Sequence, residues 1–189
     1  MRNFLEIGDL FPEEMKSKNY ILYKRIIHYE DGTTKDIIIL RDTAHDKVMM
    51  SNDEADVITC EDFLNNANGD VLILGLGIGF VVFPLLEDTL IKSIDIIEID
   101  EGVIEMVSPI IKEKDIYNKV NIFHGSAFDY YNNIEKKYDT IWIDIWEDVR
   151  EKELKEAKLL MDSYKGLLNP NGYIDYWTLD KFRIKYGIQ

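Results

Sequence analysis

The sequence is poor in cysteine and in positive charge. Cys60 is the only cysteine among 189 residues, so no internal disulfide can form, which suits a reducing cytoplasm. Lysine and arginine total 22 against 36 aspartates and glutamates, which gives a formal charge of -14 and leaves no basic stripe for phosphates. We therefore expect no nucleic-acid partner.

The chain also lacks long apolar runs and clustered histidines. No stretch approaches membrane-spanning length, and acids interrupt the apolar residues of segment 1–9, unlike a signal peptide. His28, His45 and His124 are scattered, without the spacing of a metal site. We expect a soluble cytoplasmic protein with no membrane partner and no metal.

The most informative segment is a short apolar run, 71–74, followed by Gly75, Gly77 and Gly79. An apolar run without alternation predicts a strand buried on both faces, and the glycines predict a tight turn that a ligand can approach closely. A helix starting there would point its free amides at the ligand. Glu98 ends a second apolar run roughly twenty residues later, where an acid accepts hydrogen bonds from ribose hydroxyls. The segment predicts a nucleoside-binding βαβ unit.

The glycine spacing distinguishes between nucleosides. The dinucleotide pattern G-x-G-x-x-G needs glycine at position 80, where this chain has Phe80. This difference argues against NAD or FAD as the ligand. The pattern G-x-G-x-G resembles that of class I S-adenosylmethionine-dependent methyltransferases. The resemblance runs from about Asp70 to Trp177. It includes a third strand and adenine loop at 119–129, a fourth strand with a terminal Asp at 137–144, and a turn into the fifth strand at 167–173.

This resemblance implies a Rossmann-like α/β fold and S-adenosylmethionine as cofactor. The parallel sheet should have the order 3-2-1-4-5, with strands six and seven absent or replaced by the tail from Thr178. Ser126 stands where many relatives have an Asp that binds the adenine amino group, so its hydroxyl and the backbone of Ala127 are expected to take that role. The expected cofactor contacts are Gly75, Gly77, Gly79, Glu98, Ser126, Ala127 and Asp144.

Two parts are expected along the chain. Residues 1–50 should form a small antiparallel β segment, in which strands at 20–29 and 36–40 flank the turn Asp31-Gly32 and a third strand covers 47–50. Ser51 and Glu54 have the spacing of a capping box for the helix that leads into the S-adenosylmethionine-binding domain, residues 51–189. Asp100 is expected to cap the helix that begins at Glu101.

The β segment ahead of the core is similar to spermidine synthases, which place a small strand domain before the same fold. Two positions depart from their pattern. Ile78 stands where their glycine loop carries an Asp that holds the amino end of decarboxylated S-adenosylmethionine. Their Asp-x-x-Asp signature is here Asp144 with Glu147. They also continue past the fifth strand, whereas this sequence ends at Gln189. The Asp144 region is closer to small methyltransferase-like proteins of phages and bacteria.

Asp144 is the strongest candidate for a catalytic residue. The carboxyl ends of parallel strands line the ligand crevice, so an Asp that follows a buried strand lies beside the bound sulfonium. A carboxylate there can orient or deprotonate an amine or hydroxyl, with Glu147 or Asp148 as a second acid. The alternative is that Asp144 only caps the next helix or binds the cofactor.

These observations predict a methyltransferase that acts on a small molecule. Two other functions stay open: an aminopropyltransferase of the spermidine synthase kind, and a protein that binds or degrades S-adenosylmethionine without an acceptor. An exposed fifth strand would leave a sheet edge that favours pairing, so we expect a homodimer.

Overall fold

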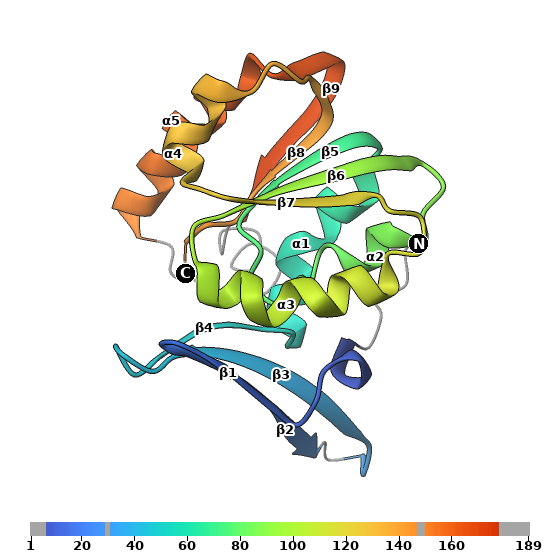
Figure 1. Cartoon of the computed structure of the whole chain (residues 1–189), viewed down its shortest axis with the longest axis vertical. Helices are drawn as coiled ribbons and strands as arrows, with labels where there is room; N and C mark the ends of the chain where they lie inside the picture. The colour runs from blue at the N-terminus through green and yellow to red at the C-terminus, as the bar shows by residue number, and fades with distance from the viewer. Residues whose placement is uncertain (1–6, 29–30, 147–149, 178–189) are drawn as a thin grey trace.

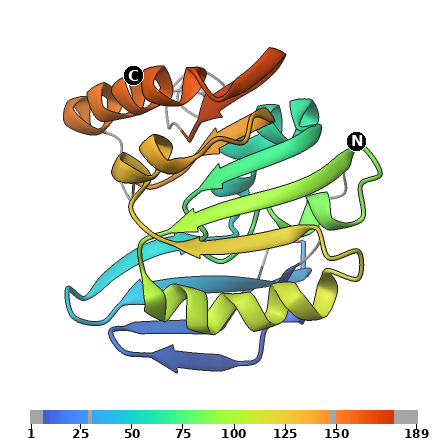
Figure 2. The same cartoon turned by 45° about the horizontal axis from the view of Figure 1, so that its top comes forward.

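The computed structural model, which describes residues 7–28, 31–146 and 150–177, is an α/β protein with two sheets (Figure 1). One is a five-stranded parallel sheet and the other a four-stranded antiparallel sheet. Helices cover both faces of the parallel sheet (Figure 2). The predicted fold class is confirmed.

The parallel sheet has the strand order β7-β6-β5-β8-β9. In sequence terms this is the predicted order 3-2-1-4-5. The chain moves outward from β5 in one direction and then in the other, so the ends of β5, β6 and β8 lie at a topological switch point. The five strands are β5 (Gly69–Leu74), β6 (Ile91–Glu98), β7 (Val120–His124), β8 (Tyr138–Ile143) and β9 (Leu168–Tyr176).

Alternate residues of β5 contribute to two different cores. Val71 and Ile73 pack with one buried cluster, which contains residues of α1 (Glu54–Asn66) and α3 (Glu101–Lys114). Leu72 and Leu74 pack with a second cluster, which contains residues of α5 (Glu151–Lys165). A strand between two helical layers needs apolar residues at every position, which explains the continuous run in the sequence.

The helix expected directly after the glycines is nearly absent. Residues 75–82 form an irregular loop with turns from residue 77 on, and α2 (Phe83–Leu86) is a single short helix. Gly75, Gly77 and Gly79 have φ values of 98°, 50° and 71°, in the left-handed region. Because an α-helix needs negative φ at successive residues, it cannot begin among them. The predicted helix start is therefore wrong.

The antiparallel sheet consists of β1 (Glu14–Ser17), β2 (Tyr20–His28), β3 (Thr34–Asp42) and β4 (Lys47–Ser51), preceded by the 3-10 helix η1 (Ile7–Leu10). Three of these strands were predicted, and β1 was not. In Figure 1 the helix α3 lies between the two sheets. The hydroxyl of Tyr20 donates to the carboxylate of Asp100, which fixes β2 to the start of α3.

The start of α1 differs from the predicted capping box. Asp53 is the residue whose carboxylate accepts the N–H of Asp56, at 3.1 Å. Ser51 is the last residue of β4, and its N–H and hydroxyl donate to the Asp56 carboxylate at 3.2 and 3.0 Å. Asp53 therefore caps the helix, and Ser51 links β4 to α1.

Across the described ranges, 7–28, 31–146 and 150–177, no helix has both the length and the apolar character required to span a bilayer.

Candidate functional site

A cavity of about 340 Å³ opens at the carboxyl ends of β5, β6 and β8. A volume of this size lies at the lower end of the range for small-molecule sites. Its walls are the glycine loop, the residues after β6 and β8, the loop between β7 and α4 (Ala127–Tyr130), and side chains of the antiparallel sheet. The antiparallel sheet contributes Tyr20, Leu40, Met49 and Met50.

The glycine loop is in close contact with its neighbours. A Cβ atom on Gly75 would lie 1.9 Å from the backbone oxygen of Asp144, and one on Gly77 would lie 2.4 Å from Sδ of Met50. Both positions also require positive φ. The loop thus forms a cavity wall without side-chain bulk at these two residues, which suits a ligand that contacts backbone.

The amides of this loop are not free, contrary to the prediction. Each already has an acceptor inside the protein. Two of the amides donate to backbone carbonyls: Gly75 N–H to Ile97 O at 2.9 Å and Gly79 N–H to Leu76 O at 2.8 Å. Two others donate to side chains: Leu76 N–H to Glu98 Oε2 at 2.8 Å and Ile78 N–H to Met50 Sδ at 3.4 Å. The amide of Gly77 also faces the Glu98 carboxylate. A ligand carboxylate that binds at these amides would have to displace one of these acceptors.

Glu98 ends β6 and has two roles. Its side chain lines the cavity, and its carboxylate accepts the N–H of Leu76 and of Asp100, both at 2.8 Å. Burial raises the pKa of Glu98, and the backbone hydrogen bonds partly offset that effect. Each carboxylate oxygen can accept two hydrogen bonds, so capacity remains for a ribose hydroxyl. The ribose contact stays a prediction, whereas the support of the glycine loop was not foreseen.

Asp100 caps α3 as predicted. Its Oδ1 accepts the N–H of Gly102 at 3.1 Å, and its second oxygen accepts from Tyr20. Since Asp100 also lines the cavity, the cap adds a negative charge to the wall.

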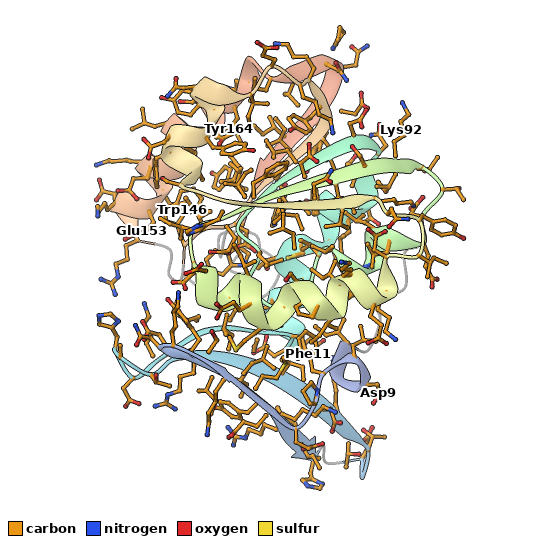
Figure 3. All side chains as sticks on the ribbon, in the orientation of Figure 1. Asp9, Phe11, Lys92, Trp146, Glu153 and Tyr164 are labelled. Carbon is orange, nitrogen blue, oxygen red and sulfur yellow. The ribbon has the colours of Figure 1, made fainter. Side chains whose placement is uncertain are left out.

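Ser126 and Ala127 lie together at the start of α4, on the cavity wall. Ser126 Oγ accepts the N–H of Phe128 at 3.2 Å and so caps this helix, a role that the sequence did not reveal. The carbonyl of Ala127 accepts from the hydroxyl of Tyr164 at 2.8 Å, and Figure 3 shows Tyr164 between α4 and the sheet. The hydroxyl proton of Ser126 is still available for a ligand.

Asp144 directly follows β8 and faces the cavity. Burial raises its pKa to about 7, and the charges of Asp56 and Glu98 act in the same direction, while the indole N–H of Trp142 acts against them. Trp142 Nε1 is buried and has no hydrogen-bond partner of normal geometry in the described part of the chain. Asp144 can therefore exchange a proton near neutral pH.

Asp56, on the first turn of α1, was missed as a residue near the site. Burial raises its pKa to about 6, and the charge of Asp53 adds to the effect. In a sequence, an acid in the first turn of a helix is typical of a favourable helix dipole interaction, so nothing marked Asp56 as special. Only the packing of α1 beside the end of β8 brings its charge to Asp144.

The charge of the cavity wall has one sign. Glu98, Asp100 and Asp144 contribute carboxylates, and no lysine, arginine or histidine is present among the described lining residues. Such a wall favours a cationic ligand over an anionic one. Glu147, the second predicted catalytic acid, and its neighbour Asp148 lie outside the described residues.

Comparison with known proteins shows one family and a shared fold. Residues 54–179 match a family model described as the spermine/spermidine synthase domain. Over 186 residues the chain is 20% identical to a spermidine synthase of Dictyostelium discoideum, covering 90% of this chain and 64% of that protein. Spermidine synthase from Thermotoga maritima is similar in structure, with a TM-score of 0.57 and 17% identity over 92% of this chain and 61% of that one.

A protein from Staphylococcus aureus, provisionally described as a caffeoyl-CoA O-methyltransferase, has a TM-score of 0.50 with 23% identity over 65% of this chain and 55% of its own. At these identities the structural comparisons show the fold alone. The chain spans less than two thirds of the length of each of these relatives.

Proposed function

Because the chain belongs to the spermine/spermidine synthase domain family, by its match over residues 54–179, we propose that it transfers an alkyl group from a sulfonium nucleoside of the S-adenosylmethionine type to an amine of a small molecule. One observation carries this proposal: the cavity at the strand ends has an acidic wall in which the pKa of Asp144 is raised to about 7. A sulfonium and an amine are both cations that such a wall attracts.

Residues that line the cavity would bind the nucleoside part of the donor. Glu98 would accept hydrogen bonds from the ribose, and Ser126 with the backbone of Ala127 would meet the adenine. Gly75 and Gly77 keep side-chain bulk out of this wall, and a Cβ atom at either position would collide with Asp144 or Met50. The bound sulfonium supplies an electrophilic carbon beside Asp144.

Asp144 would orient the acceptor amine and take its proton. The amine nitrogen forms a bond to the carbon attached to sulfur, the carbon–sulfur bond breaks, and sulfur keeps the electron pair as a neutral thioether. The proton lost by nitrogen goes to the carboxylate of Asp144. Such an in-line displacement depends mainly on alignment, which side chains fixed at a strand end can provide.

The structure favours one donor over the other. The engaged loop amides and the acidic wall offer little to the α-carboxylate of intact S-adenosylmethionine. They suit the decarboxylated form, and hence aminopropyl transfer. Methyl transfer is the second candidate, favoured by Ile78, which stands where spermidine synthases carry the Asp that holds the amino end of the decarboxylated donor.

Product analysis tests these candidates. The protein is incubated with each donor, with and without putrescine, and the products are identified by mass spectrometry. Methylthioadenosine together with an aminopropylated amine supports aminopropyl transfer, and S-adenosylhomocysteine supports methyl transfer. Breakdown of either donor without an acceptor would instead support a degrading enzyme. Asp144→Asn is the control, and the proposal fails if neither donor binds nor reacts.

A further inference from the structure

Met50 joins the antiparallel sheet to the glycine loop. It lies in β4, its side chain lines the cavity, and its Sδ is 3.4 Å from the amide nitrogen of Ile78. The same sulfur would lie 2.4 Å from a Cβ atom on Gly77. The thioether therefore rests directly on the loop, in the space that a larger residue at position 77 would fill.

The amide that Met50 caps lies in a turn of a kind that can bind an anion once the cap is removed. Ile78 lies between Gly77 and Gly79, both with positive φ, and successive amides in such turns form concave binding sites for negatively charged groups. The acceptors of Gly75 and Gly79 are backbone carbonyls, which are fixed by the fold. A thioether is a weak acceptor on a flexible side chain, so Ile78 N–H has the most exchangeable partner.

We infer that Met50 is a specificity-determining residue, whose thioether caps Ile78 N–H and fills the space over Gly77, so that the tail of a bound nucleoside cannot place a carboxylate there. This inference rests on the proposed binding of a sulfonium nucleoside. Met50 belongs to the antiparallel sheet, so a side chain from outside the parallel sheet would select donors that lack a carboxylate.

Three thioether nucleosides separate the contributions of the tail. Methylthioadenosine has no charged tail, S-adenosyl-3-thiopropylamine has an amine, and S-adenosylhomocysteine has both amine and carboxylate. Their dissociation constants are measured by calorimetric titration of the whole chain. We expect the wild type to bind the thiopropylamine more tightly than S-adenosylhomocysteine. In Met50→Ala, the affinity for S-adenosylhomocysteine should rise about tenfold relative to that for methylthioadenosine.

Met49→Ala is the matched control, because Met49 also lines the cavity and precedes Met50 in the same strand. It should leave the ratio between the two nucleosides unchanged. An unchanged ratio in Met50→Ala, with methylthioadenosine still bound, would overturn the role of Met50 alone. If the wild type binds none of the three nucleosides, the proposed function fails as well.

A measurement on the wild type avoids dependence on the folding of Met50→Ala. The methyl group of Met50 is followed by NMR with ¹³C-methyl methionine and assigned with Met50→Leu. Saturation with the thiopropylamine should shift this resonance more than saturation with methylthioadenosine, since only the longer tail reaches the thioether. Equal shifts would contradict the inference.

Discussion

The amide of Leu76 donates to Glu98 Oε2 at 2.8 Å, across 22 residues of sequence. The acid at the end of β6 therefore supports the first turn of the glycine loop as well as lining the cavity. Because Glu98 both shapes the loop and lines the cavity, its carboxylate couples stability to ligand binding.

Glu98→Ala should lower both stability and nucleoside affinity. It removes the acceptor of two backbone amides, and an unsatisfied buried donor costs roughly 1–3 kcal/mol, so we expect a loss of about 2–6 kcal/mol in the free energy of unfolding. Urea denaturation measures this loss. Glu98→Gln keeps one acceptor oxygen and should lose less. Wild-type stability in Glu98→Ala would show that the loop does not depend on this carboxylate.

Asp144 should control the pH dependence of the reaction. With a pKa of about 7, its carboxyl is protonated below neutral pH and cannot accept the proton of the amine, so kcat/KM should rise through pH 7. Asp144→Asn should lower the rate by about a hundredfold to ten-thousandfold and abolish this rise. A pH profile that is the same in both proteins would exclude Asp144 as the base.

The same pKa has a consequence for stability. The folded state holds the proton of Asp144 more tightly than the unfolded chain, whose carboxyl has an ordinary pKa near 3.8. The contribution of Asp144 to the unfolding free energy should therefore fall as the pH rises from about 4 to about 7, and change little above that. Asp144→Asn should be more stable than the wild type at pH 8, with a smaller difference at pH 4. Thermal denaturation at both pH values tests this expectation.

Asp56→Asn should lower the pKa of Asp144, because the charge of Asp56 raises it. The midpoint of the rise in kcat/KM should move to lower pH. Asparagine still accepts from Ser51, so the link between β4 and α1 is kept. Asp53→Asn is the control. Asparagine also caps helices, and the charge of Asp53 raises the pKa of Asp56 rather than that of Asp144. A midpoint that stays in place in Asp56→Asn would contradict this coupling.

Gly77→Ala and Gly75→Ala should respond differently to Met50→Ala. Both substitutions place a Cβ atom at positive φ, which costs about 1–2 kcal/mol. The added Cβ meets a flexible side chain at Gly77 but the backbone of Asp144 at Gly75. In double-mutant cycles, Met50→Ala should therefore relieve part of the loss at Gly77 and none at Gly75. Equal coupling at both positions would argue against contact between Met50 and Gly77.

The oligomeric state remains a prediction from the sheet edge. β9 pairs with β8 on one side and ends the described parallel sheet on the other. We expect a homodimer, measured by light scattering at micromolar concentration. A monomer at that concentration would show that the edge at β9 does not pair with a second chain.

Local patterns predicted much of the architecture. The continuous apolar run of β5, and the shorter apolar runs that end β6 and β8, imply strands buried on both faces, and the order of the parallel strands followed from the family resemblance. Asp100 was identified as a cap because capping depends on residues two or three positions away. Strand β1 was missed because its four residues carry no strong alternation of apolar side chains.

The sequence by itself determined the strands of the parallel sheet, the glycine turn and the acids at the strand ends, because each depends on neighbours along the chain. The tertiary structure alone decided what these residues contact. It engages the loop amides with Glu98 and Met50, prevents a helix from starting at the glycines, and brings the charge of Asp56 to Asp144. These effects arise from burial and from contacts between distant segments, which local patterns do not encode.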